Sequence, residues 1–154
     1  MLVFIALMFI GASPGSTGGG AKTSTVAVVF LAIRAYLTER QDVEVFGRRL
    51  SPDNVMRALA LLGGYSVTYI IGVGLLLTTE TAEFHRVAFE AASALGTVGL
   101  SMDLTPSLST AGKLIAVTLM FVGRVGPLTA AAAAAARRPQ AAGIRFPEGR
   151  VVVG

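Results

Sequence analysis

The chain has 154 residues, of which 53% are hydrophobic and only 14% are charged, and its formal net charge is +4 at pH 7. Soluble domains carry roughly 25% charged residues, so this composition, with a mean hydropathy of +0.69, indicates a membrane protein of at most one domain. The lack of cysteine and the single histidine exclude a disulfide framework or a zinc site, and the few aromatic residues argue against nucleic-acid binding.

The first apolar segment, residues 1–37, is interrupted by the sequence GASPGSTGGGAKTST at Gly11–Thr25. Glycine and proline break a membrane helix, and the freed backbone groups then need protein or water around them. We therefore predict a broken transmembrane helix with an intramembrane loop at 11–20. A phosphate-binding P-loop, G-x-x-x-x-G-K-[ST], is a weaker alternative. In that motif the lysine directly follows the second glycine, whereas here Ala21 stands between Gly20 and Lys22. A signal peptide is disfavoured by the lack of a positive n-region.

A basic linker at 38–57 precedes the second apolar span, predicted at 58–79. About 20 apolar residues suffice to cross a hydrocarbon core roughly 30 Å thick. Arginine residues gather in this linker and in the tail, residues 137–154, whereas the segment after the second span is acidic on balance. That acidic segment contains Glu80, Glu83, Glu90 and Arg86. The positive-inside rule therefore places the linker and the tail in the cytoplasm.

A short amphipathic helix is predicted at 84–95, followed by an irregular stretch, GTVGLS, at 96–101. The apolar residues recur at helical spacing: Phe84, Val87, Ala88, Ala91 and Leu95. The helix is too short to span a membrane, and the glycines after it predict a re-entrant segment that dips in from outside. Irregular backbone at membrane depth leaves carbonyl groups unpaired, as ion filters require. An ordinary helix–loop connection fits the same spacing equally well.

The third span is predicted at 112–136, and Arg124 lies near its middle. An arginine there costs about 2.5–3.5 kcal/mol on insertion scales, so it needs a polar partner or a pore. Gly126 and Pro127 should kink the helix at this point. The predicted fold is therefore all-α and integral to the membrane: a broken transmembrane helix, then a span–re-entrant pore helix–filter loop–span unit over 58–136. Glycines in the second span predict close helix packing: Gly63, Gly64, Gly72 and Gly74.

Three motifs, GASPGSTGGGAKTST, FEAASALGTVGLS and FVGRVGPLT, together resemble the C-terminal part of the Trk/Ktr/HKT superfamily of potassium transporters. The similarity is greatest to its bacterial KtrB-type (TrkH-like) members, whose tail resembles RFPEGRVVVG in this chain. The superfamily builds four span–pore helix–span units around one pore within one polypeptide. The resemblance therefore implies a fragment that holds the last helix of the third unit and the whole fourth unit.

The resemblance also implies roles for particular residues. One filter strand would consist of Thr97, Val98, Gly99, Leu100 and Ser101, with K⁺ bound at the first three. The gate below it would consist of Arg124, Gly15, Ser16, Thr17, Gly18, Gly19, Gly20 and Lys22.

By the same resemblance, the chain would serve potassium uptake across the plasma (inner) membrane as part of a multi-pass protein, with sodium as a possible second ion. Its implied partners are the remaining pore units, a cytoplasmic nucleotide-binding subunit of the KtrA type, and a second copy in a homodimer. No nucleophile–base or carboxylate pair lies inside the spans, so we do not expect an enzyme. A non-conducting membrane assembly or interaction protein is the alternative. It explains the spans and glycines equally well, but it leaves Arg124 and the short helix unexplained.

Overall fold

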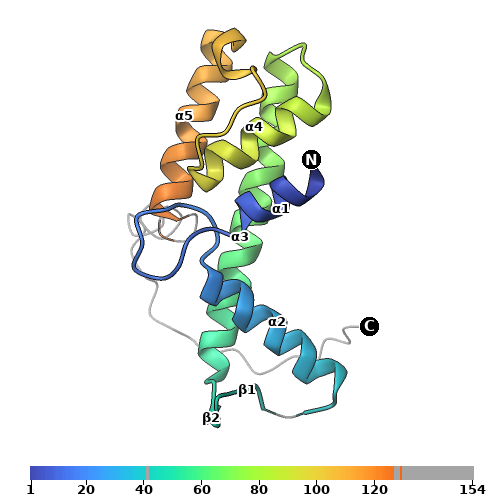
Figure 1. Ribbon diagram of the computed structural model, residues 1–154, viewed down its shortest axis with the longest axis vertical. Helices are drawn as coiled ribbons and strands as arrows, with labels where there is room; N and C mark the ends of the chain where they lie inside the picture. Colours follow the sequence, from blue (N-terminus) through green and yellow to red (C-terminus); the bar gives the residue numbers. More distant parts are fainter. Residues whose placement is uncertain (41, 127–128, 130–154) are drawn as a thin grey trace, which may run out of the picture.

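A computed structural model describes residues 1–40, 42–126 and 129, and these residues are mostly helical (Figure 1). The tail and most of the chain beyond Gly126 lie outside the described residues. In chain order the elements are α1 (Leu2–Phe9), α2 (Thr23–Leu37), β1 (Glu44–Val45), β2 (Arg48–Arg49), α3 (Pro52–Thr79), α4 (Phe84–Gly96), the 3₁₀ turn η1 (Thr105–Ser107) and α5 (Thr110–Val125).

Helix α3 forms the axis of the molecule. Its 28 residues extend about 42 Å at the usual rise per residue. Among the described residues, it is the one helix that is long and apolar enough to cross a membrane. The helix begins at Pro52 rather than at the predicted residue 58, because Ser51 caps it by accepting a hydrogen bond from Asn54 N at 3.4 Å. Proline at the first position and Asp53 in the first turn also favour a start there.

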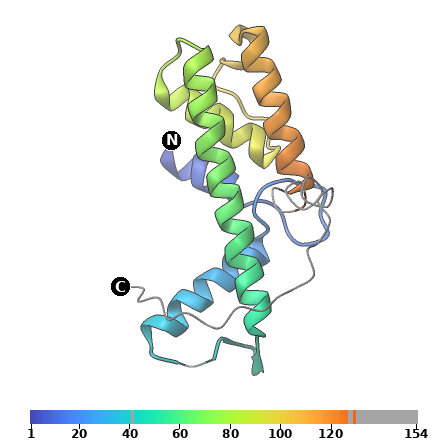
Figure 2. The same ribbon diagram turned by 180° about the vertical axis from the view of Figure 1, so that it is seen from behind.

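Helices α4 and α5 pack on one half of α3, and α2 packs along the other half (Figures 1 and 2). The core lies where α3, α4 and α5 meet, and its fully buried side chains include Leu76, Val87 and Leu95. Gly72 allows α3 to approach α5 closely, since a Cβ at that position would lie 2.6 Å from Leu119 Cδ2. The predicted role of glycine in close packing therefore holds for Gly72, whereas Gly63 faces open space.

The linker contains a small antiparallel hairpin, which corrects the prediction of an all-helical chain. Strands β1 and β2 pair with Val45 opposite Arg48. Phe46 and Gly47 connect them with φ angles of 49° and 73°. Positive φ at both central residues is the geometry of a type I′ turn, which matches the twist of a hairpin with a two-residue connection. The Phe46 side chain is fully exposed at the tip.

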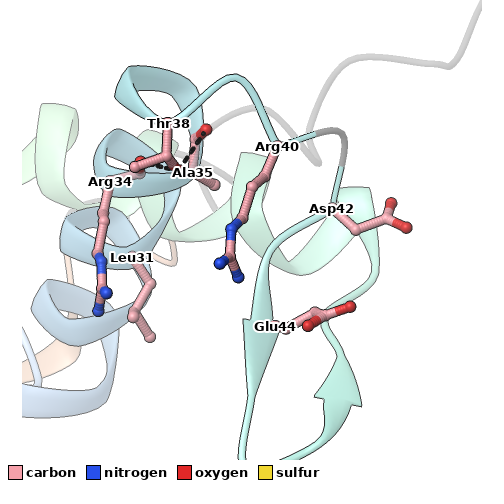
Figure 3. Close-up of a pocket in the computed structure, with 7 residues that line it drawn as sticks. All are labelled: Leu31, Arg34, Ala35, Thr38, Arg40, Asp42 and Glu44. Carbon is pink, nitrogen blue, oxygen red and sulfur yellow. Dashed lines mark hydrogen bonds between the residues drawn. The ribbon is translucent and has the colours of Figure 1, made fainter.

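A small cavity of about 110 Å³ lies between the end of α2 and this hairpin (Figure 3). Arg34 and Thr38 line it from the α2 side, and Arg40 and Glu44 line it from the linker. Thr38 Oγ1 donates to the carbonyl of Arg34 at 2.8 Å, which satisfies one of the last carbonyls of α2. The end of α2 and the start of the linker therefore lie on two sides of the same cavity.

Helix α5 runs from Thr110 to Val125, so it begins two residues before the predicted start at 112. Ser109 caps its start, and Ser109 Oγ also donates to the Glu80 carboxylate at the end of α3, at 2.6 Å. Gly126 ends the helix with a φ of 91°, at the position where the sequence predicts a kink. The remainder of the predicted span lies outside the described residues, except for Thr129.

Candidate ion-pathway site

The segment between α1 and α2 forms a loop that is closed at its base. Ile10 and Ala21 form an isolated parallel bridge. Gly11 N donates to Ala21 O at 2.7 Å, and Ala21 N donates to Phe9 O at 3.2 Å. Residues 11–20, where the sequence predicts a loop that interrupts a transmembrane helix, therefore project as one compact unit from the α1–α2 junction.

Two basic side chains bind consecutive carbonyl groups of this loop. Lys22 Nζ donates to Gly18 O at 2.5 Å and to Ser16 O at 3.2 Å. Arg124 Nη1 donates to the carbonyl between them, that of Thr17. Carbonyl groups freed from helical bonding thus receive charged donors, which make stronger hydrogen bonds than neutral ones. Arg124 has the polar partner that its sequence position demands, although it lies in the last turn of α5 and not in the middle of a helix.

The loop also contacts the end of α4. This helix ends at Gly96, one residue beyond the predicted 84–95, so the irregular stretch begins at Thr97. Thr97 has a left-handed φ of 53°, and Val98 N donates to Ser93 O at 3.0 Å, as in a Schellman motif. The Thr97 hydroxyl accepts a hydrogen bond from Gly19 N at 2.8 Å. Glycine is needed here, since a Cβ at Gly19 would lie 2.8 Å from that hydroxyl oxygen.

The stretch after α4, Thr97 to Ser101, has no regular secondary structure. Within the described residues, none of its carbonyl oxygens accepts a hydrogen bond. Gly99 has a φ of 83° and open space where a side chain would point, and the Val98 and Leu100 side chains are half exposed. Free carbonyls near the negative end of a helix dipole form an arrangement that can coordinate a cation. The described residues supply one stretch of this kind.

Close approach of α5 to α4 brings these parts together. A Cβ at Gly123 would collide with the carbonyl group of Leu95 in α4. The Tyr65 hydroxyl of α3 donates to Gly123 O at 3.2 Å. Arg124 follows directly and thus lies beside the loop, which Figures 1 and 2 show next to the C-terminal end of α5. The loop, the end of α4 and the end of α5 therefore meet at one place.

Sequence reasoning missed the role of Glu90, which it used only in the charge balance of the segment after the second span. Glu90 is only 7% exposed, and its carboxylate accepts hydrogen bonds from Ser101 Oγ at 2.9 Å and from Thr105 Oγ1. The predicted apolar face is buried, but helix α4 is buried on all sides from Val87 to Gly96, so its polar face does not meet solvent in this part. The sequence feature that could have indicated its burial is the position of Glu90 as the one charged residue within the apolar run VAFEAASAL.

The profile of the TrkH family, described as "Cation transport protein", matches residues 1–145. The chain belongs to this family. The resemblance that the three motifs indicate is therefore confirmed at the family level. The chain is 40% identical over 150 residues to Ktr system potassium uptake protein B of Bacillus subtilis (strain 168), which covers 97% of this chain and 33% of the relative.

Two other relatives have a similar identity to this chain and are also covered only in part. Ktr system potassium uptake protein B of Vibrio alginolyticus is 42% identical over 154 residues, covering 100% of this TrkH-family chain and 33% of the relative. Potassium/sodium uptake protein NtpJ of Enterococcus hirae is 35% identical over 159 residues, covering 100% of the chain and 35% of the relative. The chain thus spans about a third of the length of these curated relatives.

Proposed function

We propose that this chain forms one quarter of the ion filter and the gate of a membrane transporter that takes up K⁺. The observation that carries the proposal is the meeting of loop 11–20, the end of α4 and the end of α5. Gly19 binds Thr97, and Arg124 binds Thr17. The names of the relatives, potassium uptake proteins of the Ktr system, support K⁺ as the transported ion. The name of the Enterococcus relative supports Na⁺ as a second ion.

In this proposal the carbonyls of Thr97, Val98 and Gly99 replace part of the hydration shell of K⁺. The free carbonyls of this stretch support that role. One stretch cannot surround an ion, so the other filter strands come from further pore units of the complete transporter. Influx is driven by the membrane potential, which supplies about 2.3 kcal/mol per charge for each 100 mV.

The gate in this proposal is the glycine-rich loop, held under the filter by Arg124 and Lys22. Its residues from Gly15 to Gly20 carry the carbonyls that these two cations bind. A positive side chain beside the ion path also repels K⁺, so the closed state combines a steric and an electrostatic barrier. Movement of the loop away from Thr97 would open the path.

We further propose that the protein crosses the plasma membrane several times with the linker and tail in the cytoplasm, as the arginine distribution supports. A KtrA-type nucleotide-binding subunit would then face the linker hairpin, whose tip exposes Phe46 beside Arg48. The complete transporter would pair as a homodimer.

The proposal is tested by a chimera in which residues 1–154 replace the matching third of the Vibrio alginolyticus relative. We expect the chimera to restore growth at low K⁺ to bacterial cells without potassium uptake systems. A chimera that reaches the membrane at normal levels but takes up no K⁺ would refute the proposal. The parent transporter, produced in the same cells, is the control.

A non-conducting assembly protein is distinguished by a second measurement on the purified chimera. A filter that binds K⁺ raises the melting temperature as K⁺ replaces choline, because a ligand that binds only the folded state stabilises it. An assembly protein would show the same melting temperature in both salts.

A further inference from the structure

The stretch from Thr97 to Ser101 is held at both ends by α4. At its start, the Schellman hydrogen bonds join the backbone of Thr97 and Val98 to the last turn of the helix. At its end, two side chains one helical turn apart, Arg86 and Glu90, reach across to the chain that follows. Between these ends, the stretch makes no backbone hydrogen bond through its carbonyls within the described residues.

Glu90 binds the end of the stretch through two hydroxyl groups. Ser101 Oγ donates to Glu90 Oε2 at 2.9 Å, and Thr105 Oγ1 donates to Glu90 Oε1. Thr105 Oγ1 also lies 3.0 Å from Ser101 Oγ, so the three side chains form a closed network. A carboxylate that is 7% exposed is unfavourable unless such donors satisfy it, and bonds to a charged acceptor are stronger than neutral ones.

Arg86 donates two hydrogen bonds to Met102, the residue after Ser101. Its Nη2 and Nε donate to the carbonyl of Met102 at 2.6 Å and 3.1 Å. Arg86 and Glu90 form no ion pair with each other within the described part of the chain, where Arg49 pairs with Asp42 and His85 Nδ1 lies 3.1 Å from the Glu83 carboxylate. Both charges are therefore directed at the end of the filter stretch and at the segment that follows it.

We propose that Glu90 and Arg86 are positioning residues that set the spacing of the filter carbonyls and thereby the preference for K⁺ over Na⁺. The inference rests on the proposed function, since it assigns a role to residues behind the same stretch. Ion discrimination depends on where carbonyl oxygens stand relative to the ion, and a binding site must be held to within about 0.5 Å to keep its geometry. Neither side chain needs to touch the ion.

The test measures the ratio of K⁺ to Na⁺ uptake in the chimera. Glu90→Gln removes the charge at constant shape, and Thr105→Val removes one donor to Glu90 from outside the stretch. Both should lower the ratio, by about tenfold for a lost hydrogen bond to a charged group, while K⁺ uptake itself persists. The matched controls are Glu83→Gln, an exposed carboxylate, and Thr110→Val, an exposed threonine; both should keep the ratio.

The outcomes separate the two proposals. A selective chimera whose Glu90→Gln and Thr105→Val variants keep its ratio would overturn the positioning role alone. If Glu90→Gln is not produced, the Thr105→Val result decides. An unmodified chimera that reaches the membrane and takes up no K⁺ would count against the proposed function itself.

Discussion

Thr97 gives a sharp test of the proposed gate, because its hydroxyl joins the loop to the filter stretch through one hydrogen bond. Gly19 N donates to Thr97 Oγ1 at 2.8 Å. Thr97→Val removes this acceptor and keeps the side-chain shape, the β-branching and the backbone carbonyl. In the proposed gate the bond forms only while the loop lies under the filter, so we expect the variant to open more often.

The size of the effect follows from the surroundings of the bond. Leaving a buried donor unpaired costs about 1–3 kcal/mol. The Gly19–Thr97 bond is only partly buried, so the lower half of this range applies. A change of about 1.4 kcal/mol shifts the closed–open equilibrium tenfold. Arg124 and Lys22 still hold the loop in this variant, so the gate is weakened and not abolished.

The assay is the initial rate of K⁺ uptake at fixed external K⁺, normalised to the amount of chimera in the membrane. Thr97→Ser keeps the hydroxyl and serves as the matched control, with a rate near that of the unmodified chimera. An unchanged rate in Thr97→Val would refute the proposal that the Gly19–Thr97 hydrogen bond stabilises the closed gate. The same increase in Thr97→Ser would refute it too, since the hydroxyl would then not be the cause.

Three further variants test other parts of the site. Arg124→Ala should raise K⁺ uptake about tenfold, because a hydrogen bond from a charged group contributes about 1.5–3 kcal/mol to the closed state; an unchanged uptake rate would remove Arg124 from the gate. Gly99→Ser should lower the ratio of K⁺ to Na⁺ uptake, since a φ of 83° strains any other residue; an unaltered ratio would exclude Gly99 from the filter. Gly123→Ala should destabilise the chimera by about 1–3 kcal/mol in thermal unfolding, because the added Cβ meets the Leu95 carbonyl. Gly63→Ala faces open space and should leave the melting temperature unchanged, and equal melting temperatures for both variants would contradict the close approach.

Some features of the fold are local properties that sequence reveals directly. The glycine-rich run at Gly11–Gly20 and the glycine at position 99 stand where the chain leaves helical geometry. The length of an apolar run indicated α3, and the order of three motifs indicated the family. These predictions depend on neighbours along the chain, so no tertiary information was needed.

Other features depend on what packs around a residue. The burial of Glu90 follows from the helices that enclose α4, and its partners Ser101 and Thr105 follow it by 11 and 15 residues in sequence. The hairpin in the linker depends on positive φ at Phe46, a residue that seldom adopts it. Composition alone indicated a basic linker at 38–57 and did not indicate the hairpin.

The VGRVG motif shows why Arg124 reaches the loop. Gly123 lets α5 approach α4 closely enough to contact the Leu95 carbonyl, and Gly126 ends the helix two residues after the arginine. Each residue of a helix turns about 100°, so moving the arginine by one position would point its guanidinium away from Thr17. The two glycines therefore set the position and the direction of the guanidinium, and the arginine, the loop and the end of α4 meet at one place.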